Sequence, residues 1–112
     1  MDTQTAVFTK DTSAQALEQV GWKKMAAQQR EIFDVVLGCQ RNGMPDMSLT
    51  EIRDTYERLH GRRIDLNRVS ARVSDLVAAG RLQRREDTRP CSVTAKNIHP
   101  VFVPAHQARL FA

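Results

Sequence analysis

The chain has 112 residues, of which 41% are hydrophobic and 27% are charged, and its formal net charge is +4. This length suits one domain with a modest core and is too short for two. No stretch is long and apolar enough to cross a bilayer, and the first residues lack the pattern of a signal peptide. We therefore expect a cytoplasmic protein that does not contact a membrane.

The expected organisation is one domain between two tails. Residues 1–11 are polar and without pattern and predict a flexible N-terminal tail, residues 12–103 form the domain, and residues 104–112 form a C-terminal tail. The first long helix is predicted over about residues 23–41, and the breaker residues 42–45 end it. Its expected inward-facing residues are Met25, Ile32, Phe33, Val36 and Cys39.

A second helix is predicted to begin at Ser48. Ser48 and Glu51 have the spacing of a capping box, in which each side chain satisfies a backbone N–H of the first turn. Residues 47–49 could also supply a short strand just before the helix. The apolar residues of this segment fall on one helical stripe, which predicts that they are buried: Leu49, Ile52, Tyr56 and Leu59.

A third helix is expected between Asp65, as its N-cap, and Gly80, as its C-cap. Two strands are predicted after it, over residues 81–86 and 98–103, with a loop over residues 87–97 between them. Proline residues at 100 and 104 predict that the second strand lies at a sheet edge. The apolar stripe of the third helix repeats the offsets of the second: Leu66, Val69, Val73 and Leu76.

Two short helices followed by a basic hairpin resemble the winged helix-turn-helix proteins. Residues 72–84 resemble the segment that joins the recognition helix to a strand, and residues 89–97 are similar to the wing of small phage and prophage proteins. In those proteins a Cys-x-Val-Thr-Gly stretch leads into the last strand, and here Ala95 takes the place of that glycine. The resemblance covers about residues 25–103. It implies an α+β fold, mainly α, with a two-stranded β-hairpin wing, and it implies binding to DNA.

The distribution of charge favours the same partner. Between Arg62 and Lys96 there are nine basic and four acidic residues, a net charge of +5, so the rest of the chain carries −1. An excess of positive charge on one helix and the following hairpin is typical of a surface that meets a polyanion. The alternative is a basic surface that serves only solubility.

The stripe of the third helix turns a polar face outward. On that face Asn67, Arg68 and Arg72 are the expected base-reading residues, because arginine can make a bidentate contact with guanine and asparagine with adenine. The alternative is a solvated face on which Arg72 pairs with Asp75 or Glu86. The residues expected to contact phosphate or the minor groove are Arg62, Arg63, Arg84, Arg85, Arg89 and Lys96.

Catalysis is not expected. The three histidines His60, His99 and His106 are scattered, and Cys39 and Cys91 belong to no metal-ligand motif. No nucleotide loop or nucleophile motif is present in the sequence, so neither a cofactor nor a metal is expected.

The C-terminal segment carries a second motif. Gln107, Leu110 and Phe111 resemble the Gln-x-x-Leu-Phe peptide with which bacterial replication and repair proteins dock on the sliding clamp. The alternative is that Leu110 and Phe111 pack on the domain or on a partner in a homodimer.

The sequence therefore predicts sequence-specific binding to double-stranded DNA, in phage or prophage transcription control or replication. The rival prediction is a replisome interaction module that docks on the clamp.

Overall fold

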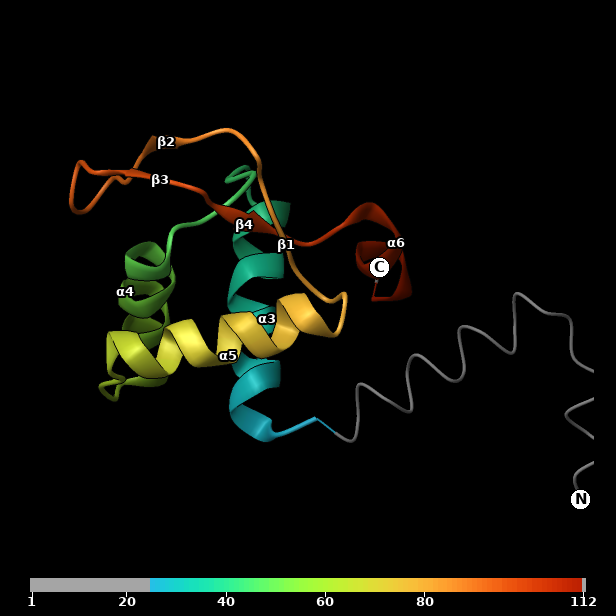
Figure 1. Ribbon diagram of the computed structural model, residues 1–112. Coiled ribbons are helices and arrows are strands. Elements are labelled where there is room, and N and C mark those ends of the chain that lie inside the picture. The colour runs from blue at the N-terminus through green and yellow to red at the C-terminus, as the bar shows by residue number, and fades with distance from the viewer. Residues whose placement is uncertain (1–24, 112) are drawn as a thin grey trace, which may run out of the picture.

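The computed structural model describes residues 25–111, so the tail expected at residues 1–11 lies outside the described part (Figure 1). The structure is α+β and mainly helical, which confirms the expected class. None of the described helices is long and apolar enough to cross a membrane. The elements are α3 (Ala27–Arg41), α4 (Leu49–His60), α5 (Leu66–Ala78), β1 (Gln83–Arg84), β2 (Arg89–Pro90), β3 (Asn97–Ile98), β4 (Val101–Phe102) and α6 (Ala105–Leu110).

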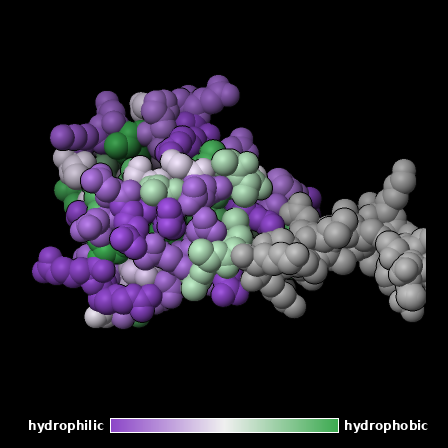
Figure 2. Space-filling model, turned by 60° about the horizontal axis from the view of Figure 1, so that its bottom comes forward, coloured by the Kyte–Doolittle hydropathy of each residue, from purple (hydrophilic) through white to green (hydrophobic). Residues whose placement is uncertain are grey.

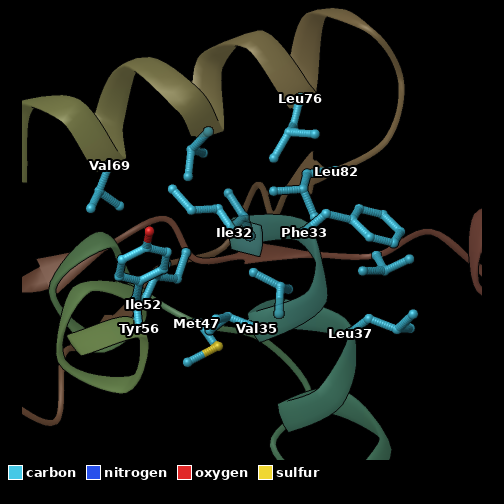
Figure 3. Packing of buried hydrophobic residues seen from close by; sticks show 14 of the residues in the cluster. Ile32, Phe33, Val35, Leu37, Met47, Ile52, Tyr56, Val69, Leu76 and Leu82 are labelled. Atoms are coloured by element: carbon cyan, nitrogen blue, oxygen red, sulfur yellow. The ribbon is translucent and has the colours of Figure 1, made fainter. Parts of the chain in front are cut away.

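Helices α3, α4 and α5 form the core, and each packs on the other two. In Figure 3, Val69 and Leu76 of α5 point toward Ile32 and Phe33 of α3, and Tyr56 of α4 closes the side of the cluster. Burying such side chains contributes about 1.5–3 kcal/mol each, which makes this cluster the main stabilising element of the fold. The buried apolar residues are Ile32, Phe33, Val35, Val36, Leu37, Met47, Ile52, Tyr56, Ile64, Val69, Val73, Leu76, Leu82, Val101 and Val103.

The predicted stripes are correct in their central turns and wrong at two ends. Leu59 is 67% exposed in the last turn of α4, and His60 instead lies against the Tyr56 ring, with the ring centroids 4.4 Å apart. Leu66 is 38% exposed at the first position of α5. Both residues lie in terminal turns, where less of the helix surface faces the other two helices. The helix predicted from residue 23 begins at Ala27.

The start of α4 has the predicted capping box. Ser48 Oγ accepts a hydrogen bond from the Glu51 backbone N–H at 3.1 Å, and Glu51 Oε1 accepts one from the Ser48 N–H at 2.9 Å. An N-cap of this kind typically contributes about 1 kcal/mol. Asp65 is the N-cap residue of α5, but its side chain makes no capping bond. Gly80 follows the end of α5 with φ +77°, a left-handed conformation that glycine adopts without a Cβ penalty.

The strand around Val101 is central, so the prediction of a sheet edge was wrong. Val101 pairs with Arg84 of β1 on one side, and on the other it exchanges two backbone hydrogen bonds of 2.9 Å with Met47. Pro100 lies just outside this pairing, and its carbonyl accepts a bond from the Arg85 N–H at 2.8 Å. The missing N–H of proline therefore interrupts no ladder bond, which is why a central strand can follow it.

Beyond this small sheet, the chain continues into a second antiparallel pair, the β2–β3 hairpin. Residues 85–88 on one side oppose only residues 99–100 on the other, so the two strand pairs are separated by a bulge. A bulge bends the strands and increases their twist. As Figure 1 shows, the hairpin reaches out over α4, whereas α6 lies at the opposite end of the molecule.

The tip of the hairpin holds a backbone conformation that disfavours its residue. Ala95 has φ +63°, in the left-handed region, while Cys91 N donates to Lys96 O and Ala95 N donates to Cys91 O, both at 2.8 Å. Left-handed backbone costs a non-glycine residue about 1–2 kcal/mol. Glycine would adopt this conformation without that cost.

We expect Ala95→Gly to stabilise the protein by about 0.5–1 kcal/mol, because relief of the left-handed strain exceeds the added flexibility of glycine in the unfolded chain. The midpoint of urea unfolding measures the change. Ala79→Gly is the matched control, since Ala79 has φ −83° and should gain nothing. Equal effects at both positions would contradict the explanation.

Candidate nucleic-acid interface

The outer face of α5 presents the residues predicted to read bases. Asn67, Arg68 and Ala71 are exposed and Arg72 is half-buried, opposite the buried stripe of the helix. Together with Asp65, these four side chains line a shallow hollow on the surface. Ala71 adds no bulk at its centre, so a partner can approach the backbone of α5 closely.

Arg72 is not free on this face. Its Nε lies 3.1 Å from Asp75 Oδ2, which matches the pairing considered as an alternative in the sequence. Gln29 of α3 donates from Nε2 to the same carboxylate oxygen at 2.9 Å. The charge of Arg72 is partly compensated by this ion pair, which lies at the edge of the α5 face.

Four other predicted residues are exposed and make no side-chain hydrogen bond or ion pair within residues 25–111. They come from the link before α5, the exposed face of α5, strand β1 and the loop between β2 and β3. Cations that have no carboxylate partner are available to an anion in solution. These residues are Arg63, Arg68, Arg84 and Lys96.

A groove separates the hairpin from the first turns of α4 and α5. Its lining includes the apolar side chains of Leu49, Leu66 and Ile98 and the cationic side chains of Arg84 and Lys96. The surface seen in Figure 2, with the bottom of Figure 1 turned forward, is mostly hydrophilic, and its apolar areas are small and separate. A mostly hydrophilic surface with cationic and small apolar areas suits a hydrated anionic partner that also has apolar faces. It suits an extended apolar partner less well.

Arg62, a predicted phosphate contact, is used inside the molecule. Its Nη2 donates to Glu31 Oε1 at 2.9 Å and to the Tyr56 hydroxyl oxygen at 2.8 Å, and Tyr56 itself donates to Glu31 at 2.7 Å. The hydrogen bond from Tyr56, followed by those from Arg62, lowers the pKa of Glu31. This triad joins the α4–α5 link to α3, so Arg62 shapes the turn before α5.

Arg89 is the centre of a larger network, and its role as a free phosphate contact is not supported. Its guanidinium donates five hydrogen bonds: one to the Asp46 carboxylate, two to the Glu51 carboxylate, and two to backbone carbonyls. The shortest, to Asp46 Oδ1 and Glu51 Oε1, are 2.7 Å. Arg85 shares Asp46 through a 2.6 Å bond and lies over the Phe102 ring. A guanidinium with all its donors engaged has none left for DNA.

The same network ties the hairpin to α4. Burial would raise the pKa of the Glu51 carboxyl, but hydrogen bonds from Arg89 and from the backbone N–H groups of Ser92 and Ser48 outweigh it and lower the pKa to about 2. The Glu51 bonds in turn raise the pKa of Arg89. Glu51 therefore caps α4 and anchors the base of the hairpin at once. Sequence reasoning identified only the cap.

Cys91 completes this junction. Its Sγ is buried and lies 3.0 Å from Ser48 Oγ, and it accepts a bond from Val93 N at 3.4 Å. Burial raises the pKa of the thiol, but these bonds and those of Thr94 outweigh it and lower the pKa to about 7. Cys91 and Cys39 are both free thiols and are not bonded to each other.

The C-terminal segment is a packed helix, which differs from the tail expected at residues 104–112. Gln107 is 2% exposed and accepts a hydrogen bond from Arg81 Nη1 at 3.0 Å. The Phe111 ring meets Phe33 edge to face, with centroids 5.6 Å apart, and Leu110 is half-buried. Phe111 thus packs on the domain, as in the alternative considered for this segment, and Leu110 is partly covered. Clamp docking would require Gln107 to leave its internal partner.

No protein-family profile, curated protein or solved structure matches the chain.

Proposed function

We propose that the protein is a winged helix-turn-helix protein that binds double-stranded DNA in a sequence-specific manner, acting in phage or prophage transcription control or replication. In this proposal α5 is the recognition helix and the β2–β3 hairpin is the wing. The observation that carries it is the set of exposed cations that have no ion-pair partner within residues 25–111, on the α4–α5 link, α5, β1 and the hairpin loop, beside Asn67 and Arg72 on the outer face of α5.

The order of the elements supports the proposal. A helix, a bridge residue at Met47, two further helices and the β2–β3 hairpin follow one another, and Met47 pairs with Val101 of β4, the strand that comes after the hairpin. In a helix-turn-helix, the second helix of the pair enters the major groove and the first crosses the backbone. Here that pair would be α4 and α5.

In this proposal the predicted residues take three roles. Asn67, Arg68 and Arg72 face outward from α5 and are the proposed base-reading residues. Arg63, Arg84 and Lys96 are the proposed phosphate contacts, because they flank α5 and have no internal partner among the described residues. Arg62, Arg85 and Arg89 would act indirectly, by holding the link and the hairpin in place.

The test is a salt titration of binding to duplex DNA. Each phosphate contact contributes about 0.9 to the slope of log K against log salt, so Arg84→Ala combined with Lys96→Ala should lower the slope by about 1.8. Fluorescence anisotropy of a labelled duplex at several salt concentrations gives these slopes. The double variant should weaken binding to all duplexes alike, since phosphate contacts carry no base information.

Arg109→Ala provides the control, because Arg109 is exposed on α6, at the far end from the hairpin (Figure 1). Its slope should equal that of the unmodified protein. Absence of salt-dependent binding to any duplex would overturn the proposed function. An unchanged slope in the double variant would place the hairpin away from the DNA.

A further inference from the structure

A chain of contacts runs from the start of α3 to the outer face of α5. The backbone N–H of Ala26 donates to Gln29 Oε1 at 3.2 Å, and Gln29 Nε2 donates to Asp75 Oδ2 at 2.9 Å. The same Asp75 oxygen lies 3.1 Å from Arg72 Nε. Both ends of the Gln29 amide are thus occupied, and the Asp75 carboxylate is held from two sides.

This arrangement fixes which edge of Arg72 faces outward. The Nε atom is buried beside the carboxylate at ion-pair distance but makes no hydrogen bond to it, while the side chain as a whole keeps 31% of its surface exposed. The guanidinium carries its remaining donors on the two Nη atoms, which no hydrogen bond within residues 25–111 occupies. Because Arg72 lines the same hollow as Asn67 and Arg68, a bidentate donor pair is presented at the proposed DNA surface.

Resting on the proposed function, we propose that Asp75 and Gln29 are positioning residues that present Arg72 to a guanine in the major groove. Guanine offers two acceptors there, O6 and N7, which match two parallel N–H donors, whereas adenine offers one acceptor and one donor. An arginine already held in place loses less side-chain freedom on binding than a mobile one. Arg72 would then determine specificity, and Asp75 would set how strictly it does so.

Asp75 should also lower the affinity for random DNA, and this effect makes its role measurable. Its side chain is 43% exposed beside a surface that would meet phosphates, so its negative charge opposes non-specific binding. Neutralising it should therefore weaken discrimination between bases while leaving the affinity for random duplexes unchanged or higher. A residue that only stabilised the fold would lower both affinities together.

The experiment begins with selection of a preferred duplex from a random library by the unmodified protein. Each guanine of that duplex is then replaced by adenine, and Arg72→Ala identifies the guanine whose replacement no longer matters. At that position we expect the unmodified protein to lose about tenfold or more in affinity. In Asp75→Asn the loss should fall to about threefold or less, and Gln29→Ala, which keeps the charge of Asp75, should give an intermediate loss.

Ser74→Ala is the matched control, because Ser74 is exposed, neighbours Asp75 and takes no part in the chain of contacts. Thermal melting of every variant shows whether it is folded, and Gln29→Ala replaces Asp75→Asn if the latter is not. If both variants keep the full guanine preference, or if specific and random affinities fall together, the inference is wrong although DNA binding stands. If no duplex is selected at all, the proposed function itself fails.

Discussion

Replacing Arg89 with alanine should destabilise the fold by about 2–4 kcal/mol, somewhat less than the loss for a fully buried ion pair, because the Arg89 side chain is 31% exposed. Asp46 and Glu51 are only 7% and 5% exposed, and Arg89 supplies hydrogen bonds to both. Without it, two carboxylates would lie close together in a poorly solvated place. The free energy of unfolding, measured by urea denaturation, gives the loss directly.

Arg84→Ala is the matched control, because Arg84 is an exposed arginine of β1 with no ion pair among the described residues. We expect it to change stability by less than about 0.5 kcal/mol. Similar losses in the two variants would show that the network around Arg89 contributes no more than a surface charge. DNA binding should be weakened by both changes, but only Arg84→Ala should lower the salt slope.

The pH dependence should follow the same network. Since the fold lowers the pKa of Glu51 from 4.5 to about 2, the ionised carboxylate stabilises the folded state. This contribution is complete above about pH 4.5, and it is lost as the pH falls toward 2, where the folded state also takes up the proton. In Arg89→Ala this part of the acid-induced loss should shrink, because the hydrogen bonds from Arg89 are gone and only those from Ser92 and Ser48 still lower the pKa. Unfolding experiments at several pH values between 2 and 6 compare the two proteins.

The sequence predicted the helical part of the fold well because its signals are local. The capping box at Ser48 and the stripes of α4 and α5 depend on spacings of three to seven residues along the chain. The burial of Tyr56, Val69 and Val73 follows from those spacings. Leu59 shows the limit, because periodicity gives the direction of a side chain but not where the neighbouring helices end.

The candidate site could be predicted only in part, because charge composition does not show pairing. Arg84 and Arg89 look alike in the sequence, yet one is exposed and the other bonds to residues 38 and 43 positions away. Asp46 and Glu51, which neutralise Arg89, precede residues 62–96, the segment that carries the positive excess in the sequence. Ion pairs between residues so far apart in the sequence can be identified only once the fold is known.

Arg81 and Gln107 illustrate the same limit in the C-terminal segment. Arg81 was counted in the basic excess, but it is 7% exposed and turns toward α6. Gln107 was expected in an extended peptide, and a six-residue helix holds it in the interior instead. A helix this short has little intrinsic stability, so tertiary packing decides whether it forms.

Replacing both Leu110 and Phe111 with alanine should therefore cost about 2–4 kcal/mol, less than for two fully buried residues because each is only partly covered. Phe111 packs on Phe33 and its carbonyl accepts a hydrogen bond from Arg41, so both the ring and the end of α6 hold the segment on α3. Gln40 adds a second attachment just before α6, since its amide exchanges bonds of 3.1 and 2.9 Å with the backbone of Val103. Thermal melting of the double variant measures the effect as a lower midpoint.

The control changes His106 and Arg109 to alanine, because both are exposed on α6 and should leave the midpoint nearly unaltered. The comparison also decides between the two roles considered for this segment. Residues reserved for docking on a sliding clamp would lie free in the unbound protein, so their loss would not affect melting but would abolish capture by the clamp. If the melting midpoint drops strongly in the Leu110 and Phe111 variant but not in the control, the two residues belong to the domain, because apolar side chains stabilise a fold only when folding buries them.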